Sequence, residues 1–350
     1  MFFLTADRAR AAAMLQTAAA ICRLGAGPLR EHPGPEPCRP SPPDGFRGLP
    51  DGADLVRDPD LIRQQFPFVA PDVAAMLHVR RCGWLRAPRL GRCLLERAVA
   101  SGVRLVRDRV VSVQTAGGRV QAVTLASGGK INTRVFVIAA GPRLPQAGAM
   151  LGLDLPVFCE LHGKMALEDR LGVIPRDAPL MIWNDPVRLD WSELQRPEFP
   201  AGVHFRPREQ DGKPVLLIIW TYDVKPVAPA FPPRFDAHYP EVLLRGLARM
   251  VPGLTAYFGQ GASGLVDGGY YCKTRENRPL IGPLPVEGAF VIGALSGYGI
   301  MGSQAAAELL AAHVTGSALP DYAPAFLLRR YEDPGYQRRL PELEALGGQL

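Results

Sequence analysis

The residues best suited to chemistry lie in a glycine-rich segment near the end of the chain, at 290–302 (FVIGALSGYGIMG). The segment reads as an apolar strand, a glycine turn and the start of a helix, an arrangement that presents backbone amides to an anion or a polarised carbonyl. Gly297 and Gly299 let a flat ligand approach the backbone closely, and the positive end of the helix faces that ligand. Many α/β proteins carry such a turn, so the pattern alone does not name a ligand.

Cysteine and histidine offer no comparable cluster. The six cysteines are scattered, at positions 22, 38, 82, 93, 159 and 272. None forms a C-x-x-C pair or lies beside a pair of histidines, so no metal site is expected. A disulfide framework is not expected either in a chain of 350 residues, and we expect reduced thiols in a reducing compartment. His78, His162 and His204 have no spacing partner and are expected to be structural.

Composition narrows the class of protein. The chain is 47% hydrophobic and 21% charged, which is typical of a folded globular protein rather than a disordered one. Its apolar runs, such as 135–140 and 215–220, have strand length and fall short of the roughly 20 residues of a membrane span. The net charge of +6 fits an anionic ligand or nucleic acid. The arginine-rich stretch 80–97 matches no nucleic-acid module, so we interpret it as a solvated helix face and expect no nucleic-acid partner.

Helices and strands must position the glycine turn. An amphipathic helix is predicted over 86–100 and a strand over 103–106. Three strands of an antiparallel meander follow, at 110–114, 120–125 and 131–139, separated by Gly-Gly turns. The last of them is apolar on both faces and runs into 139–142 (AAGP), so we expect it inside a layered α/β core rather than at an edge.

The rest of the chain supplies a second sheet and its connections. A mostly antiparallel sheet is predicted over 156–225, then a helix over 239–251, and after the closing strand at 289–293 a helix over 303–315. The N-terminus reads as a strand, a turn and a helix over 8–24; a transit peptide is the alternative, which we favour less. Residues 25–50 hold eight prolines and are expected to be a linker or a disordered insertion.

Several segments together resemble the D-amino-acid oxidase-like FAD-dependent oxidoreductases, in the branch of glycine oxidase, sarcosine oxidase and dimethylglycine dehydrogenase. That family shows T-x-D-x-x-P-x-I-G, a strand, G-x-S-G-x-G and a long helix. The counterparts here lie at 274–282, 290–293, 295–299 and 303–315. The resemblance implies an α/β (α+β) fold, with a Rossmann-like FAD-binding domain and an antiparallel-sheet substrate domain.

The resemblance also implies FAD as the cofactor and assigns residues to it. The turn residues would hold the pyrimidine edge of the flavin: Ser296, Gly297, Tyr298, Gly299, Ile300 and Met301. Val110 matches the position whose backbone holds the adenine, and Gly141 and Pro142 match the turn beside the diphosphate. Members that tether the flavin use a cysteine five residues before the family threonine, where this chain has Gly269, so we expect non-covalent FAD.

The implied reaction is oxidation of a C–N bond in a small amine or amino acid. Glycine oxidase-like members clamp the substrate carboxylate with an arginine where this chain has Tyr271. Tyr270, Tyr271 and Trp220 would instead form an aromatic pocket for a secondary or tertiary amine, with core packing as the alternative. Lys225 resembles the lysine that faces the flavin in sarcosine oxidase and is the candidate catalytic residue; a surface lysine is the alternative.

One feature of the family is absent from this sequence. The family begins with a strand, G-x-G-x-x-G and a helix. No such motif follows the N-terminal strand here, and the two matches to the pattern lie far downstream, at 259–264 and 297–302. We therefore expect an N-terminally truncated chain. Its FAD-binding domain would comprise 76–145 and 264–350 without the first βαβ unit, and its substrate domain 1–24, 51–75 and 146–263.

The missing motif leaves other functions open. A non-catalytic family member that acts as a binding or assembly factor, or an inactive truncated fragment, is the alternative to an active oxidoreductase. Reduced thiols indicate the cytoplasm, and the transit-peptide interpretation would indicate the mitochondrial matrix. The substrate, the electron acceptor and the oligomeric state stay open.

Overall fold

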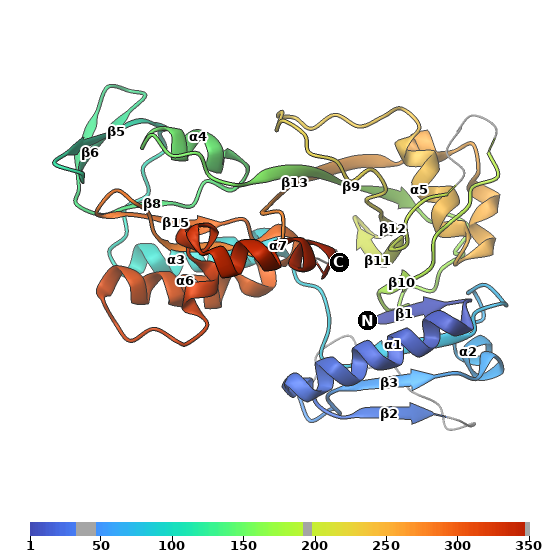
Figure 1. Ribbon diagram of the computed structural model, residues 1–350. Coiled ribbons are helices and arrows are strands. Elements are labelled where there is room, and N and C mark those ends of the chain that lie inside the picture. Colours follow the sequence, from blue (N-terminus) through green and yellow to red (C-terminus); the bar gives the residue numbers. More distant parts are fainter. Residues whose placement is uncertain (33–46, 192–197, 347–350) are drawn as a thin grey trace. The chain divides into compact units, whose positions relative to one another are not determined.

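The computed structural model describes residues 1–32, 47–191 and 198–346, which form two compact units (Figure 1). The first unit comprises Met1–Trp84, His162–Asp223 and Pro232–Gly268. The second comprises Leu85–Leu161, Val224–Phe231 and Gly269–Leu350. The functional roles that we predicted for the two domains stay predictions.

The first unit is built on a large, mostly antiparallel sheet, as the sequence predicts. Its strands follow the order β13-β9-β12-β11-β10-β1-β4-β3-β2, and β9 and β13 continue into the second unit. The strands are β1 (Phe2–Thr5), β2 (Leu29–His32), β3 (Ala53–Val56), β4 (Ala75–Val79), β9 (Phe158–Glu168), β10 (Met181–Trp183), β11 (His204–Gln210), β12 (Lys213–Ile219) and β13 (Leu265–Lys273). β1 lies in the middle, parallel to β10 and antiparallel to β4.

Helices pack on this sheet through apolar faces. α1 (Arg8–Ile21) begins where the Asp7 carboxylate accepts a hydrogen bond of 2.8 Å from the Ala9 amide, and it packs Met14 against Leu55 and Leu77. The predicted N-terminal strand, turn and helix are therefore confirmed. α2 (Pro59–Gln65) and α5 (Tyr239–Ala248) belong to the larger core, which aromatic side chains of β1, β10 and β11 and aliphatic side chains of β12 fill.

Part of the predicted linker is a strand. β2 pairs in parallel with β3 at the edge of the sheet, between Pro28 and Pro33. Proline lacks a backbone donor, so an edge is where a strand flanked by prolines is tolerated. Residues 33–46 of the predicted linker lie outside the described residues.

The second unit contains two small sheets. One is the antiparallel meander β5 (Val110–Ala116), β6 (Arg119–Leu125) and β7 (Lys130–Asn132). The other has the order β14-β15-β8, from β14 (Leu280–Pro283), β15 (Ala289–Gly293) and β8 (Phe136–Ile138). α6 (Gly299–Thr315) packs along β14 and β15 (Figure 1). The remaining helices of this unit are α3 (Ala87–Ala100), α4 (Leu144–Ala149) and α7 (Pro334–Leu346).

Three expectations for this unit are corrected. The segment predicted as one strand over 131–139 is two strands in different sheets, because Thr133 turns the chain and its hydroxyl donates to the Val135 carbonyl at 2.7 Å. β8 is an edge strand of the described sheet, and Val137 is exposed rather than enclosed in a core. Residues 103–106 are not a strand, since no neighbouring strand pairs with them in the described part of the chain.

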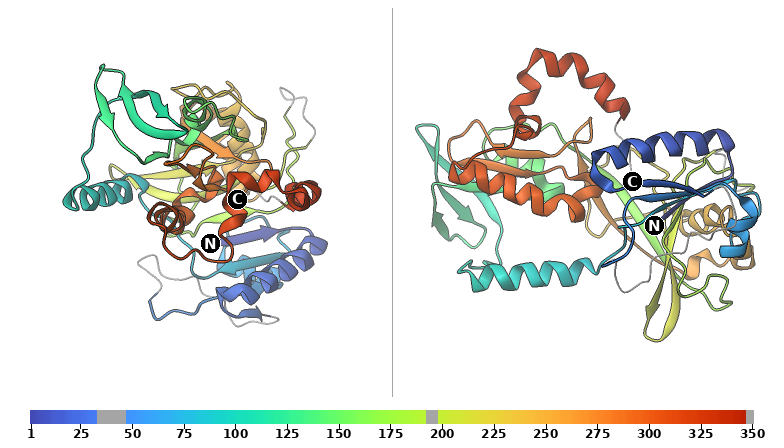
Figure 2. Two further views of the ribbon diagram at one scale, coloured as in Figure 1. Left: turned by 60° about the vertical axis from the view of Figure 1, so that its left-hand side comes forward. Right: turned by 90° about the horizontal axis from the view of Figure 1, so that it is seen from below.

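The predicted helix over 86–100 is confirmed as α3, yet none of its side chains is buried. Three of its apolar residues, Leu94, Leu95 and Val99, are exposed. α3 is the cyan helix in the two views of Figure 2. No helix of the described residues is long and apolar enough to cross a membrane. Within the same ranges, no group of three or more His, Cys, Asp or Glu side chains is placed to hold a metal ion.

Candidate functional site

The candidate site lies at one edge of the sheet β14-β15-β8. β15 and β8 are parallel, with Ala289 opposite Phe136 and Val291 opposite Ile138. Their carboxyl ends therefore open on the same side, where ligands of open α/β sheets bind. The chain leaves β15 into the turn 294–298 and leaves β8 into a short 3₁₀ turn, Gly141–Arg143. The structure thus brings Gly141 and Pro142 to the same edge as the predicted flavin-binding residues 296–301.

The family motif at 274–279 reaches this edge as well. β14 is antiparallel to β15, with Leu280 opposite Gly293, so the residues that precede β14 lie beside the end of β15. The Thr274 hydroxyl donates to the Arg278 carbonyl at 2.7 Å and accepts from the Arg278 amide at 2.9 Å, which closes this loop on itself. Three segments that are distant in sequence therefore meet at one edge.

The turn after β15 holds an unusual backbone conformation. Ala294 has φ +54° and Ser296 has φ +49°, and they are two of the four non-glycine residues with positive φ in the described chain. A third, Asn277 at φ +58°, lies in the 274–279 loop. Each such residue costs on the order of 1–3 kcal/mol, and strain of this kind concentrates at functional sites. Three strained residues at one sheet edge mark it as a site.

Gly297 is required for steric reasons. A Cβ atom on Gly297 would lie 2.7 Å from Cε2 of Tyr271, closer than real Cβ contacts allow. Tyr271 is a half-buried residue of β13, and burial raises the pKa of its hydroxyl. The turn therefore packs directly on the Tyr271 ring, and position 297 tolerates only glycine without rearrangement.

The backbone N–H groups in the first turn of α6 have no side-chain cap. The helix has 17 residues, enough for a full helix dipole. Ile300 is exposed and Met301 is 62% exposed. The start of α6 therefore lies at the carboxyl edge of the sheet without a side-chain cap, where its backbone N–H groups can bind an anionic or electron-rich group.

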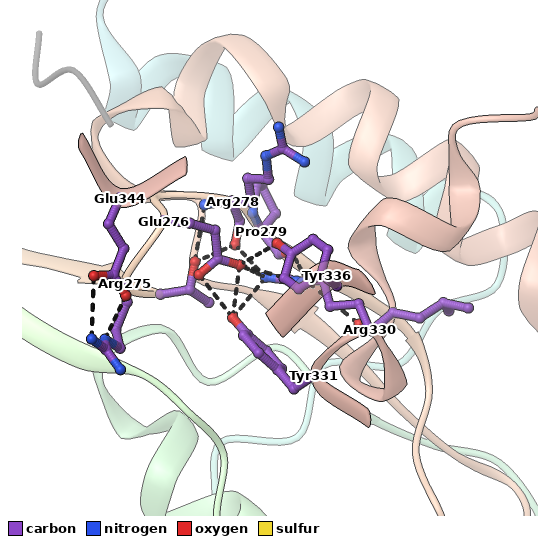
Figure 3. Close-up of polar contacts among 10 residues, drawn as sticks. Arg275, Glu276, Arg278, Pro279, Arg330, Tyr331, Tyr336 and Glu344 are labelled. Carbon is purple, nitrogen blue, oxygen red and sulfur yellow. Dashed lines mark hydrogen bonds and ion pairs between the residues drawn. The ribbon is translucent and has the colours of Figure 1, made fainter. Parts of the chain in front are cut away.

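A buried carboxylate holds the 274–279 loop in place (Figure 3). Nε and Nη2 of Arg330 donate to Oε1 of Glu276 at 3.0 and 2.6 Å. The hydroxyls of Tyr331 and Tyr336 donate to the same oxygen, each at 2.8 Å. Burial by itself raises the pKa of Glu276, but hydrogen bonds from its own backbone, Arg330 and Tyr331 leave it below the usual value. Sequence reasoning missed this cluster; the acidic residue within the 274–282 motif was the available signal.

The three aromatic residues predicted to line a pocket do not share one environment. Trp220 is 1% exposed in the core of the first unit, where Nε1 donates to the Pro200 carbonyl at 3.1 Å. This placement is the core packing that we left open. The Tyr270 hydroxyl donates to the Ala230 carbonyl at 2.7 Å and accepts from the Ala230 amide at 2.9 Å. Of the three aromatic side chains, only Tyr271 contacts the glycine turn.

Two further predicted residues lie elsewhere in the second unit. Val110 begins β5 and is half-buried opposite Leu125, in the sheet that does not contain β15. Lys225 is exposed and precedes the segment that Tyr270 fixes. Their assignment to adenine binding and catalysis rests on the resemblance alone.

The residues present fit one end of FAD. The glycine turn, the uncapped start of α6 and the Tyr271 ring form one surface that a flat, electron-rich ring edge such as that of a flavin could contact. No G-x-G-x-x-G follows the N-terminal strand β1; the two matches to the pattern lie at 259–264 and at 297–302, which includes the glycine turn itself. At the diphosphate side, Gly141 has φ +52° and open space where a Cβ atom would lie.

Comparison with known proteins shows the family and the fold of the chain. The DAO family model, described as "FAD dependent oxidoreductase", matches residues 47–313. No curated protein matches the chain. The solved L-proline dehydrogenase of P. horikoshii aligns with a TM-score of 0.68 at 16% identity, over 95% of this chain and 76% of that one.

Two other solved structures give similar values. Glycine oxidase of Geobacillus kaustophilus aligns with a TM-score of 0.67 at 18% identity, over 94% of this chain and 74% of that one. Iminodiacetate oxidase of Chelativorans sp. BNC1 aligns with a TM-score of 0.66 at 19% identity, over 93% and 74%. These likenesses show the fold, and the mixed α/β class predicted from the sequence is confirmed.

Proposed function

Because the chain belongs to the DAO family of FAD-dependent oxidoreductases, we propose that it uses FAD to oxidise a C–N bond of a small amine or amino acid. One observation carries the proposal: the strained glycine turn and the uncapped start of α6 lie at the common carboxyl edge of β15 and β8. Proline dehydrogenase, glycine oxidase and iminodiacetate oxidase share the fold, which supports a substrate of this class.

FAD, when bound, supplies the acceptor for the two electrons and the hydrogen that leave the substrate carbon. The protein's part is positioning and electrostatics. The amides of residues 296–301 and the positive end of α6 would stabilise negative charge at the pyrimidine edge. Gly141 and Pro142 would lie beside the diphosphate and Val110 beside the adenine. We propose non-covalent FAD, because Gly269 occupies the tethering position.

On the substrate side we propose Tyr271 as the contact residue. Burial raises the pKa of the Tyr271 hydroxyl, so it stays protonated at neutral pH and can donate a hydrogen bond to a substrate. Tyr270 would contribute its ring only, since the Ala230 backbone uses its hydroxyl. Lys225 is the proposed catalytic residue, which would face the flavin. Trp220 is left out of the proposed pocket because its ring lies in the core.

A non-catalytic binding or assembly role is the second candidate. The exposed apolar face of α3 would suit a binding protein.

Reconstitution with FAD separates these functions. Purified chain is incubated with FAD, freed of excess by gel filtration and measured for flavin absorbance; we expect retained flavin. Gly297→Ala should lose it through the clash with Tyr271, and Gly302→Ala should keep it, because its Cβ would meet Leu295 at an ordinary 3.8 Å. No retained flavin in the native chain, or equal retention by both variants, would refute the proposed site.

A second step tests the reaction. The FAD-loaded chain is mixed anaerobically with glycine, L-proline or iminodiacetate, and loss of flavin absorbance reports reduction. We expect at least one compound of this class to bleach the flavin. Retained flavin that none of a broader panel of secondary amines reduces would favour the non-catalytic role.

A further inference from the structure

Two buried cysteines lie on neighbouring strands beneath the candidate site. Cys159 of β9 is 4% exposed and Cys272 of β13 is 6% exposed, and both belong to one apolar cluster of the second unit. The order of the sheet places β9 beside β13. The mechanism proposed above uses neither thiol.

Contacts along β9 and β13 set the register of the pair. Lys164 Nζ lies 3.1 Å from Asp267 Oδ2, and a Cβ atom on Gly268 would lie 3.1 Å from the Gly163 Cα. Between these two contacts the residue number increases on β9 and decreases on β13, so the strands are antiparallel. Continuing this register by four residues on each strand, from Gly163 to Cys159 and from Gly268 to Cys272, places Cys159 opposite Cys272. Directly opposite residues have Cα atoms roughly 4.5–5.5 Å apart, within the range of about 4.4–6.8 Å that a disulfide spans.

The two thiols are hydrogen-bonded to each other and to both turns of the site. The Cys272 thiol donates to the Cys159 sulfur, and the Cys159 thiol donates to the Pro142 carbonyl at 3.9 Å. The Ala294 amide donates to the Cys272 sulfur. The Cys159 thiol is thus hydrogen-bonded to the turn after β8, and the Cys272 sulfur lies within reach of Cys159 and of the Ala294 amide in the turn after β15.

We propose that Cys159 and Cys272 are a redox-sensitive pair, which a hydroperoxide such as hydrogen peroxide oxidises to an intramolecular disulfide. The Cys159 thiolate attacks one peroxide oxygen, the O–O bond breaks, and the Cys159 sulfenic acid and hydroxide form. The Cys272 proton converts that hydroxide to water. The Cys272 thiolate then attacks the Cys159 sulfur, the S–O bond breaks, and the second hydroxide takes up the proton that Cys159 gave up. Two thiols and one peroxide thus give one disulfide and two waters.

The order of attack follows from the hydrogen bond between the thiols. Donation from Cys272 lowers the pKa of the Cys159 thiol, although burial opposes this effect. The same bond, together with burial, raises the pKa of Cys272, which therefore keeps its proton for the first leaving group. Cys159 is the attacking sulfur and Cys272 the resolving one.

Oxidation changes the candidate site because a disulfide has no S–H donor. The Pro142 carbonyl loses its donor, so the turn after β8 is no longer hydrogen-bonded to Cys159. The consequence for the cofactor rests on the proposed function. Retention of FAD by the chain falls when the cysteine pair is oxidised and returns when dithiothreitol reduces the disulfide.

The test uses a variant in which only the pair remains. Cysteines 22, 38, 82 and 93 are replaced by serine, and the reduced folded chain is treated with hydrogen peroxide, unfolded and alkylated with N-ethylmaleimide. We expect a mass lower by two hydrogens, no alkylation, and a cross-linked peptide that joins Cys159 to Cys272. Adding Cys159→Ser or Cys272→Ser should leave one alkylated thiol and no internal cross-link.

Two further measurements show whether misfolding of the cysteine variant, rather than the native fold, produces the cross-link. Peptide mapping of the unmodified chain should show the same cross-link, and peroxide added in concentrated urea should form it more slowly, because 112 residues separate the two cysteines. Two outcomes would refute the proposed disulfide. Either both thiols are still alkylated after peroxide treatment, or the mass of the chain rises by added oxygen and no cross-linked peptide is found. A reduced chain that never retains FAD would refute the proposed function and leave this mapping result unchanged.

Discussion

Replacing Arg330 with methionine should loosen the loop that carries the family motif. The Arg330 side chain is 2% exposed and makes two hydrogen bonds to Glu276, at 3.0 and 2.6 Å. It also donates to the Pro279 carbonyl at 2.9 Å and to the Arg278 carbonyl at 3.1 Å. The variant would leave the fully buried Glu276 carboxylate without its charged partner, with the tyrosine hydroxyls and its own backbone as donors (Figure 3). Removing one partner of a buried ion pair costs about 3–5 kcal/mol.

This loss of free energy should appear as more frequent local opening of the loop 274–279. Every 1.4 kcal/mol is a factor of about ten, so amide exchange in the loop 274–279 and in β14 should accelerate at least ~100-fold in Arg330→Met. Hydrogen exchange with mass spectrometry measures it directly. All four tryptophans, at 84, 183, 191 and 220, lie in the first unit, so their fluorescence should not change.

The matched control is Arg329→Met, because Arg329 is the exposed neighbour of Arg330. It should leave exchange in the loop within about twofold of the native rate, since exposed substitutions usually change stability by less than ~0.5 kcal/mol. Equal exchange in the Arg330 and Arg329 variants would refute the role given to the buried pair. The pKa of Glu276 lies below its usual value in the folded chain, so the pair stabilises above the unfolded pKa of roughly 4.3, and this stability is lost as pH falls through the folded pKa.

Three further predictions concern single positions. Ser296→Gly removes the backbone strain at φ +49° and should stabilise the second unit by about 1 kcal/mol, as measured by hydrogen exchange. A less stable variant would show that the Ser296 backbone is not strained. Burial, the N-terminal amine and Arg80 lower the pKa of His78 to about 3, so the neutral ring stabilises the first unit and this stability is lost as pH falls from roughly 6.5 to about 3. His78→Phe, which keeps the stacking on Phe2 at 4.1 Å, should flatten that dependence in tryptophan fluorescence, and an unchanged profile would exclude His78 as its source. Gly246→Ala would put a Cβ atom 2.1 Å from the Trp220 ring and should cost about 1–3 kcal/mol in urea unfolding, whereas a neutral effect would show that α5 can shift.

Elements with a strong local pattern were predictable from the sequence. The strand Ala289–Gly293, the glycine turn and the helix after it follow from apolar periodicity and glycine spacing, although α6 begins at Gly299 rather than at residue 303. The helix over 86–100 follows from its amphipathic period, but that period could not show that its apolar face is exposed. A local pattern specifies the element and leaves its partner undetermined.

Features that depend on distant partners were not predictable. β2 is a short strand among prolines, formed because β3 offers a parallel neighbour. Residues 103–106 have strand composition and form no strand, since none of the described strands pairs with them. The pair Cys159 and Cys272, the contact of Glu276 with Arg330 and the burial of Trp220 depend on chain segments brought together by the fold, which spacing along the sequence does not encode.

The central claim is that the main-chain donors at residues 296–301 hold the pyrimidine edge of a flavin. Amide hydrogen exchange across 294–302, with and without FAD, measures those donors directly. We predict slower exchange at the first amides of α6 when FAD is bound, with no change in β7. Bound FAD that leaves exchange across 294–302 unchanged would contradict the claim.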